Sequence, residues 1–368
     1  MRKWSVQLLT LALSMAALAG PSASSRQAAA TPAFEAYSRF DFVPGETVIA
    51  FDDFTQDAIG DFPAKWNTNA SGEIVTIASR PGRWLKVTGG GVFVPEFPAV
   101  LPDNFTLEYD MLVAPNFNGY RIDTVIAELQ DVKQPAGWQG VDNRFHFTAL
   151  PGAPDGSSQM EPRQGGVGVA AVSADIKRFS NKGALVHVSV WRQRQRVRVY
   201  FDENKVWDLP RALLATAKYN TILFFTPNVE KGSEYYLSNV RFAVGAPDTR
   251  NKLLTEGKWV TRGILFDVNS DKLKAESYGA LKEISTVLTE NAEVKVQIVG
   301  HTDSDGDAAQ NLDLSKRRAA SVRAALISQF SIDGARLTTD GKGEAQPADK
   351  NETPIGKANN RRVEFIKL

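Results

Sequence analysis

The chain has 368 residues, 43% of them hydrophobic, which is enough for two or three domains that each bury a core. Lys and Arg number 43 against 42 Asp and Glu, so the formal charge of +1 gives no field that would gather nucleic acid or anionic lipid. The chain has no cysteine, which excludes disulfides, thiolate metal sites and a cysteine nucleophile, and its three histidines lack metal-ligand spacing. We therefore expect no nucleic acid partner, no metal and no cofactor.

Residues 1–19 have the parts of a secretory signal peptide: a basic start, an apolar run from Leu8 to Leu18, and the small residues Ala17 and Ala19 before a cleavage point. The apolar run is shorter than the roughly 20 residues that a membrane-spanning helix requires. No cysteine follows it to carry a lipid anchor. We expect an exported protein in which residues 20–33, rich in Ala and Ser, form a flexible leader.

From residue 34 to residue 245, short runs of alternating apolar and polar residues are separated by Gly, Pro, Asn and Asp. In the run 105–111, Phe105, Leu107, Tyr109 and Met111 share one face, as in a half-buried strand. Many short strands with turn signals between them predict an antiparallel β-sandwich. Similar runs cover residues 48–54, 84–88, 124–129, 185–191, 197–202, 221–225 and 235–244.

The segments 197–207 and 236–242 resemble the concanavalin-like and laminin-G-like jelly rolls, which makes the expected sandwich jelly-roll-like. A membrane β-barrel is the alternative interpretation, because barrel strands also alternate apolar and polar residues. The arginine-dense stretch 191–198, followed by the polar stretch 202–205, favours a solvated hairpin over a membrane-facing strand. We expect a carbohydrate or an envelope protein as the partner of this domain.

After a linker at 246–257, residues 258–368 show helical periodicity between short strands, at 264–266, 294–299 and 363–366. The order strand, helix, strand, helix, strand, strand predicts a compact α+β domain. Two apolar stripes with helical spacing mark the helices, one made by Tyr278, Leu281, Ile284 and Leu288 and the other by Leu314, Val322, Ala325 and Leu326.

A spaced motif runs through this second domain. It comprises residues 266–270, 300–306, Asn311, 314–315, 318–319 and 360–365. The set resembles the OmpA-like C-terminal domain, a peptidoglycan-binding module of many envelope proteins, and the likeness covers the last third of the chain.

Two charged residues of this motif suit the binding of an amino acid. Asp303 leaves a predicted strand on a loop, and Arg318 lies fifteen positions later in the following helix. The carboxylate of Asp303 can accept hydrogen bonds from an ammonium group, while Arg318 can pair with a carboxylate of the same ligand. A simple internal ion pair between the two is the structural alternative.

The resemblance implies that the ligand is the diaminopimelate of the peptidoglycan stem peptide. It also implies that Asn269, Thr302, Asn311 and Arg361 line the pocket. Asn311 could equally cap the second helix. Arg361 is a better candidate than its neighbour Arg362, because Arg362 alternates with Val363 and suits a solvated strand position.

Glu108 and Asp110 share one face of a predicted strand, as paired carboxylates do in jelly-roll glycosidases. Two acids on a wet sheet face are also ordinary. A wall-localised enzyme that acts on glycans is therefore only the alternative hypothesis. Our main expectation is a protein without catalytic residues. We expect it in the periplasm or on the periplasmic face of the outer membrane, bound non-covalently to peptidoglycan.

Overall fold

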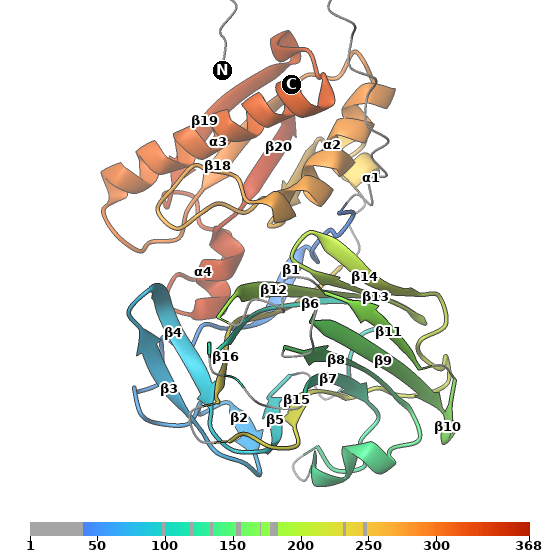
Figure 1. The fold of residues 1–368 in the computed structure, drawn as a ribbon. Coiled ribbons are helices and arrows are strands. Elements are labelled where there is room, and N and C mark those ends of the chain that lie inside the picture. Colours follow the sequence, from blue (N-terminus) through green and yellow to red (C-terminus); the bar gives the residue numbers. More distant parts are fainter. Residues whose placement is uncertain are drawn as a thin grey trace, which may run out of the picture. The chain divides into compact units, whose positions relative to one another are not determined.

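Two β-sheets followed by an α+β domain make up the part of the chain that the structure describes, as Figure 1 shows. The computed structural model describes residues 40–97, 100–115, 117, 121–132, 135–151, 156–169, 171–176, 183–230, 233–245 and 249–368. These residues belong to one compact unit that runs from Ser38 to Leu368. The signal peptide predicted at 1–19 and the leader predicted at 20–33 lie outside the described residues.

The first sheet has eight strands in the order β14-β13-β12-β6-β16-β4-β3, and β1 pairs antiparallel with β16 outside this path. Alternation along β6 turns Leu107, Tyr109 and Met111 into the core, as the sequence predicted. The strands of this sheet are β1 (Thr47–Asp52), β3 (Gly72–Ile77), β4 (Arg80–Val87), β6 (Asn104–Val113), β12 (Leu185–Gln193), β13 (Arg196–Phe201), β14 (Asn204–Leu209) and β16 (Tyr235–Val244).

The second sheet also has eight strands, in the order β10-β9-β8-β7-β15-β5-β2, with β11 pairing with β9. The 3₁₀-helix η1 (Pro135–Gly140) places the buried Trp138 edge-to-face against Phe225 and His146. The strands are β2 (Trp66–Thr68), β5 (Gly91–Pro95), β7 (Ile122–Ala127), β8 (Arg144–Leu150), β9 (Ser157–Gln164), β10 (Val167–Gly168), β11 (Val172–Asp175) and β15 (Thr221–Thr226).

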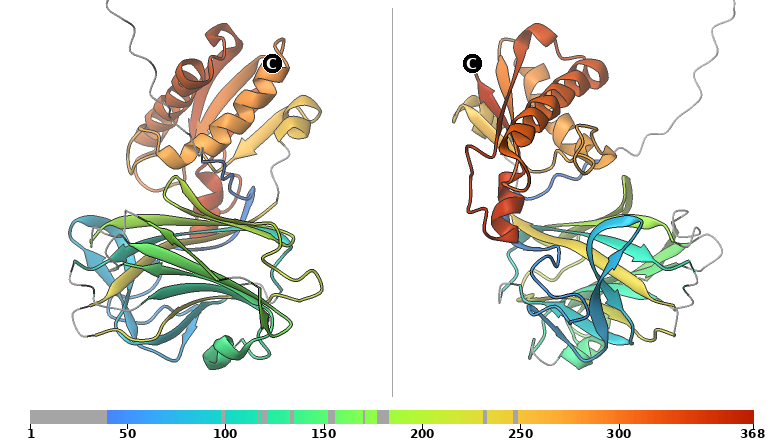
Figure 2. Two further views of the ribbon diagram at one scale, coloured as in Figure 1. Left: turned by 45° about the vertical axis from the view of Figure 1, so that its right-hand side comes forward. Right: turned by 90° about the vertical axis from the view of Figure 1, so that its left-hand side faces the viewer.

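The inner faces of the two sheets share one hydrophobic core, so the predicted β-sandwich is confirmed (Figure 2). Trp66 stacks on Phe224 at 5.8 Å between ring centroids. The hydroxyls of Tyr109 and Thr124 join the two sheets through a buried hydrogen bond of 2.6 Å. Each fully buried large apolar side chain in such a core contributes about 1.5–3 kcal/mol. The sandwich is therefore a packed scaffold.

The C-terminal domain has a four-stranded sheet in the order β17-β20-β18-β19, and the helices α2 and α3 pack on it through one apolar core. The pairing of β18 with β19 is parallel, and the other two pairings are antiparallel. Its elements are α1 (Thr249–Leu254), β17 (Lys258–Thr261), η3 (Ala275–Ser277), α2 (Tyr278–Glu290), β18 (Val296–His301), α3 (Ala308–Phe330), η4 (Gly334–Arg336), β19 (Leu337–Gly343), α4 (Pro354–Asn360) and β20 (Val363–Lys367).

This α+β architecture agrees with the sequence prediction, with three local differences. The first strand is β17, at 258–261, whereas in the segment predicted as a strand at 264–266 the structure has only an isolated bridge from Phe266 to Leu273. A short helix, α4, lies between the last two strands, and α1 falls within the segment predicted as a linker. Both helices have only six or seven residues, too few to show a periodic apolar stripe.

One buried amide ties α4 to the first strand of the sandwich. Asn359 Oδ1 accepts a hydrogen bond from Val48 N, and Asn359 Nδ2 donates to Val48 O, each at 3.2 Å. Ala358 packs with Val48 and Ala243 in a small apolar cluster beside this pair. The face of the C-terminal domain that carries α4 therefore lies against the sandwich.

Among the helices in the described part of the chain, none combines the length and the hydropathy that crossing a bilayer requires.

Candidate ligand-binding site

The loop after β18 is positioned by a close approach of this strand to α3. A Cβ atom at Gly300 would lie 2.3 Å from the backbone oxygen of Ser315, so only glycine allows the spacing. The loop then turns into α3, whose N-cap is Asp307, with a side chain that accepts from the backbone N–H groups of Ala309 and Gln310. These constraints place Asp303 beside the start of the helix.

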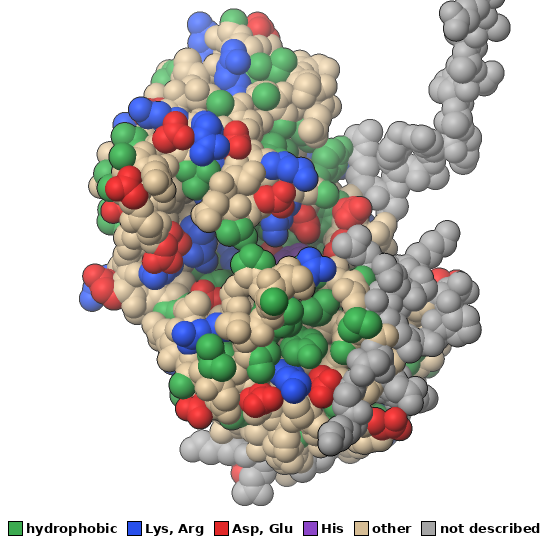
Figure 3. Space-filling model, turned by 60° about the vertical axis from the view of Figure 1, so that its left-hand side comes forward, with side chains coloured by type: hydrophobic (Ala, Val, Ile, Leu, Met, Phe, Trp, Pro, Cys, Tyr) green, Lys and Arg blue, Asp and Glu red, His purple; other side chains and the backbone are tan. Residues whose placement is uncertain are grey.

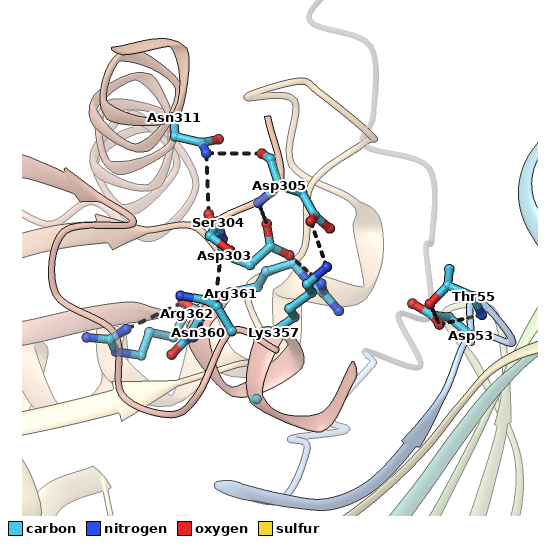
Figure 4. A network of polar contacts seen from close by, with 12 residues as sticks. Asp53, Thr55, Asp303, Ser304, Asp305, Asn311, Lys357, Asn360, Arg361 and Arg362 are labelled. Carbon is cyan, nitrogen blue, oxygen red and sulfur yellow. Dashed lines mark hydrogen bonds and ion pairs between the residues drawn. The ribbon is translucent and has the colours of Figure 1, made fainter. Parts of the chain in front are cut away.

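Asp303 is buried, with 12% of its side chain exposed, and both of its carboxylate oxygens have partners. Oδ2 pairs with a guanidinium nitrogen of Arg361 at 2.6 Å, and Oδ1 accepts from the backbone N–H of Asp305 at 3.2 Å. Figure 4 shows this arrangement, with Lys357 paired to Asp305 next to it. These two contacts hold the carboxylate in place at the edge of the site.

Arg318 lies on α3 and is held by one hydrogen bond to the backbone and one contact with an aromatic ring. Its Nε donates to the backbone oxygen of Ser270 at 3.0 Å, and its guanidinium lies 4.9 Å from the ring centroid of Phe266. Burial lowers the pKa of Arg318, and the charge of Asp303 partly offsets that effect. Among the described residues no carboxylate lies within ion-pair distance of Arg318. The alternative of a simple Asp303–Arg318 ion pair is therefore wrong, since Asp303 pairs with Arg361.

Arg361 connects the carboxylate of Asp303 to the sandwich. It follows directly after α4, and its guanidinium carbon lies 5.4 Å from the ring centroid of Phe51 on β1. The side chain of Arg361 is 40% exposed, so its pairing with Asp303 is the more accessible part of the site. Arg362 is instead buried and bound to Glu364 at 2.9 Å, so the solvated strand position proposed for it from the sequence is wrong.

The other predicted residues surround the same loop. Asn311 Nδ2 donates to the backbone oxygens of Asp303 and Asp305 and to Glu344, so it fixes the loop; the helix cap is Asp307, and the capping role considered for Asn311 is wrong. Thr302 is buried, and its hydroxyl has no hydrogen-bond partner in the described part of the chain. Asn269 is exposed, has a φ of 53°, and precedes the carbonyl that holds Arg318.

A cavity of about 250 Å³ adjoins these residues. Of the six predicted site residues, Arg318 and Arg361 line it, while Asp303 is bound to Arg361 and is not among the lining residues. The sandwich supplies the opposite wall, and Figure 3 shows charged side chains gathered around a hollow in which histidine is visible. The lining residues that the sequence prediction did not assign to this site are Phe51, Glu108, Asp110, His187, Asn239, Arg241, Arg262, Ile264, Leu265, Phe266, Lys274, Glu276, His301, Ala358, Arg362 and Val363.

The sandwich wall centres on an ionic cluster around His187. Its Nδ1 lies 2.7 Å from Asp110 Oδ1, and its Nε2 lies 3.7 Å from Glu108. Arg241 pairs with Glu108, and Asn239 donates to Asp110 at 2.7 Å. Burial lowers the pKa of His187, but the hydrogen bonds that its ring donates to Asp110 and Glu108, together with the charges of both acids, outweigh burial and raise the pKa to about 10.

This cluster changes the interpretation of the paired acids. Glu108 is only 4% exposed, so the wet sheet face considered from the sequence is wrong. Burial opposes ionisation of both acids, but Arg241 and His187 outweigh it at Glu108, and His187 with Asn239 outweighs it at Asp110, so both pKa values are lowered. A glycosidase needs one carboxyl group with a raised pKa to act as general acid. The pair does not have that property.

A larger cavity, of about 910 Å³, lies wholly in the sandwich domain. Its lining is rich in acids and amides, and Lys218 is the one cation among its lining residues. Backbone and side-chain hydrogen bonds already engage Glu128, which accepts from Lys218 N and Asn143 Nδ2. The lining residues are Val100, Glu128, Leu129, Gln130, Asp131, Gly140, Val141, Asp142, Asn143, Lys218 and Asn220.

Comparison with known proteins identifies the family of the C-terminal domain. A family model described as OmpA family matches residues 265–361. The outer-membrane lipoprotein YfiB of Pseudomonas aeruginosa is 34% identical over 160 residues, which cover 43% of this chain and 94% of that protein. The probable lipoprotein YiaD of Escherichia coli is 39% identical over 127 residues, covering 32% of this chain and 58% of YiaD. Outer membrane porin F of Pseudomonas aeruginosa is 38% identical over 101 residues, covering 27% of this chain and 29% of the porin.

A β-sandwich joined to an α+β domain with these relatives defines a multidomain protein of the cell-envelope class. The chain belongs to the OmpA family. It spans 29% of the length of porin F and 58% of the length of YiaD, so its likeness to them is limited to part of each protein.

Proposed function

We propose that this chain is an exported envelope protein that binds peptidoglycan non-covalently through the diaminopimelate of the stem peptide. The observation that carries the proposal is the state of Arg318, a largely buried guanidinium beside Asp303 with no carboxylate partner among the described residues. A buried charge without an opposite charge is costly, and a ligand carboxylate would relieve that cost. Arg318 can receive this carboxylate in a bidentate pair.

The ammonium group of the same ligand would go to Asp303. Its present partner is Arg361, which is 40% exposed and can swing into solvent at little cost. Asn311 holds the backbone of the loop, so the carboxylate stays in place when its partner changes. Thr302 and Asn269 flank the two charges and complete the set that the family resemblance implies for the pocket.

We place the protein in the periplasm or on the periplasmic face of the outer membrane. The relatives named as outer-membrane lipoprotein and outer membrane porin support this location. The sandwich domain would meet a carbohydrate or an envelope protein, and its cavity of about 910 Å³ is the first place to look for that partner. Catalysis is not part of the proposal, because Glu108 and Asp110 both have lowered pKa values.

The test is co-sedimentation of the full mature chain with purified peptidoglycan sacculi. Arg318→Gln and Asp303→Asn should each lower binding at least tenfold, because each leaves one charge of the ligand unpaired, at a cost of about 1.4 kcal/mol or more.

Neighbouring residues of the same type provide matched controls. Arg317 is 46% exposed and pairs with Asp271 and Asp313, so Arg317→Gln should sediment like the wild type. Asp305 pairs with Lys357 at the surface, so Asp305→Asn serves the same purpose for the carboxylate. Equal sedimentation of Arg318→Gln and Arg317→Gln would contradict the proposed site.

A further inference from the structure

Three cations around the 250 Å³ cavity have no carboxylate partner among the described residues. Within the described residues, Arg262, Lys274 and Arg318 form no ion pair, although all three line this cavity. The other cations of the lining are neutralised by neighbours: Arg241 by Glu108, His187 by Asp110, Arg361 by Asp303, and Arg362 by Glu364. Glu276 is one further carboxylate in the lining, so against these three cations the described part of the cavity still carries an excess of positive charge.

The contacts of Arg262 support this view. Its guanidinium donates only to backbone oxygens, those of Asn359 and Glu46. Burial and the neighbouring guanidinium groups of Arg241 and Arg362 lower the pKa of Arg262 to about 10. A second anion placed in the cavity would reduce this repulsion, just as one carboxylate would on Arg318.

Lys274 lies close enough to Asp110 for its charge to lower the pKa of that carboxyl group. Asp110 is already engaged by His187 and by Asn239, each at 2.7 Å. Among the described residues the ammonium group of Lys274 forms no hydrogen bond or ion pair, so its donors are available to a ligand.

We propose that Arg262 and Lys274 form a second carboxylate subsite, completed by the sandwich wall, so that the full chain recognises an acidic peptide with two neighbouring carboxylates. This rests on the proposed function, in which Arg318 takes the first carboxylate. A cavity of about 250 Å³ is below the roughly 300–1,000 Å³ of pockets for drug-sized ligands, so it suits one amino acid and an adjoining group and excludes a disaccharide.

In a peptidoglycan stem, the group next to diaminopimelate is the free α-carboxylate of the γ-linked glutamyl residue. That carboxylate is the one that the second subsite would bind. Amidation removes its charge while keeping its size, so the subsite would distinguish a free acid from an amide at this position.

The experiment is a calorimetric titration of the full mature chain with two soluble peptides. One is L-alanyl-γ-D-glutamyl-meso-diaminopimelate, and the other is the same peptide with the glutamyl α-carboxylate amidated. The wild type should bind the free acid about tenfold more tightly, which corresponds to about 1.4 kcal/mol. Lys274→Gln should abolish this preference by weakening binding of the acid and leaving binding of the amide unchanged.

Lys272→Gln is the matched control, since Lys272 lies two positions away, is 80% exposed and does not line the cavity. It should keep the wild-type preference. Equal affinity of the wild type for the two peptides, or a loss of affinity for both peptides in Lys274→Gln, would overturn the second subsite and leave the proposed function standing. Failure of the wild type to bind either peptide would contradict both.

Discussion

Replacing His187 with glutamine tests the ionic cluster at the sandwich wall. The change removes a buried cation from between Glu108 and Asp110 and leaves Arg241 and Asn239 as their remaining partners. Removing one member of a buried ion pair costs about 3–5 kcal/mol, because the remaining charge stays buried without compensation. We expect His187→Gln to lower the free energy of unfolding by about 3 kcal/mol near neutral pH, since two partners remain.

The pH dependence of this loss follows from the direction of the pKa shift. The pKa of His187 rises from an ordinary 6.5 to about 10 in the folded protein. A raised pKa means that the folded state binds the proton more tightly, so the stabilisation is complete below about pH 6.5. It is lost as the pH rises through about 10. The difference between wild type and His187→Gln should therefore shrink between these two values.

Urea unfolding followed by tryptophan fluorescence, at several pH values across this range, measures the difference. His146→Gln is the control, because burial lowers the pKa of His146 to about 4 and its ring is already neutral throughout the range. A His187→Gln difference that is independent of pH, or one that grows toward pH 10, would refute the assignment of His187 as a buried cation.

Three further predictions concern other parts of the chain. Asp123 is fully buried, and burial raises its pKa to about 7 although the charge of Arg121 opposes the shift. The unfolded chain ionises Asp123 more readily than the folded protein does, so the fold loses stability as the pH rises from the ordinary pKa of 3.8 to about 7. Asp123→Asn should raise the free energy of unfolding at about pH 8 by about 1–3 kcal/mol, and a decrease in urea unfolding would contradict this. A Cβ atom at Gly279 would lie 1.9 Å from Phe42 O, so Gly279→Ala should destabilise the protein by about 1–3 kcal/mol. Thermal unfolding measures this loss, and an unchanged midpoint would contradict the prediction. Binding to sacculi should weaken between about 0.1 and 1 M salt, where the Debye length falls from about 10 to 3 Å, and salt-independent sedimentation would argue against an ionic site.

Local patterns predicted much of the fold, because they recur within a few residues. Alternation along 105–111 gave the core face of β6, and the two apolar stripes gave α2 and α3. The strand β9, Ser157–Gln164, was missed because its sequence is mostly polar and shows no alternation of apolar residues. It is a strand through its long pairing with β8, which is a tertiary contact.

The site was harder to predict, because its decisive contacts join distant residues. The motif pointed to Asp303 and Arg318, but the actual partner of Asp303 is Arg361, which lies 58 positions away. Glu108 and Arg241 are 133 positions apart, and no local spacing relates them. A signal for the sandwich wall was present in the two acids on one face of β6, yet only the fold shows that His187 lies opposite Asp110 in the neighbouring strand.

Calorimetric titration of free meso-diaminopimelate into the full mature chain tests directly whether Arg318 and Asp303 bind this ligand. We expect one binding site per chain, retained in Arg317→Gln and lost in both Arg318→Gln and Asp303→Asn. Free meso-diaminopimelate should also displace the wild-type protein from sacculi. Titration curves for Arg318→Gln that match the wild type, or sacculus binding that free diaminopimelate does not compete, would contradict the claim that these two charges bind the ligand.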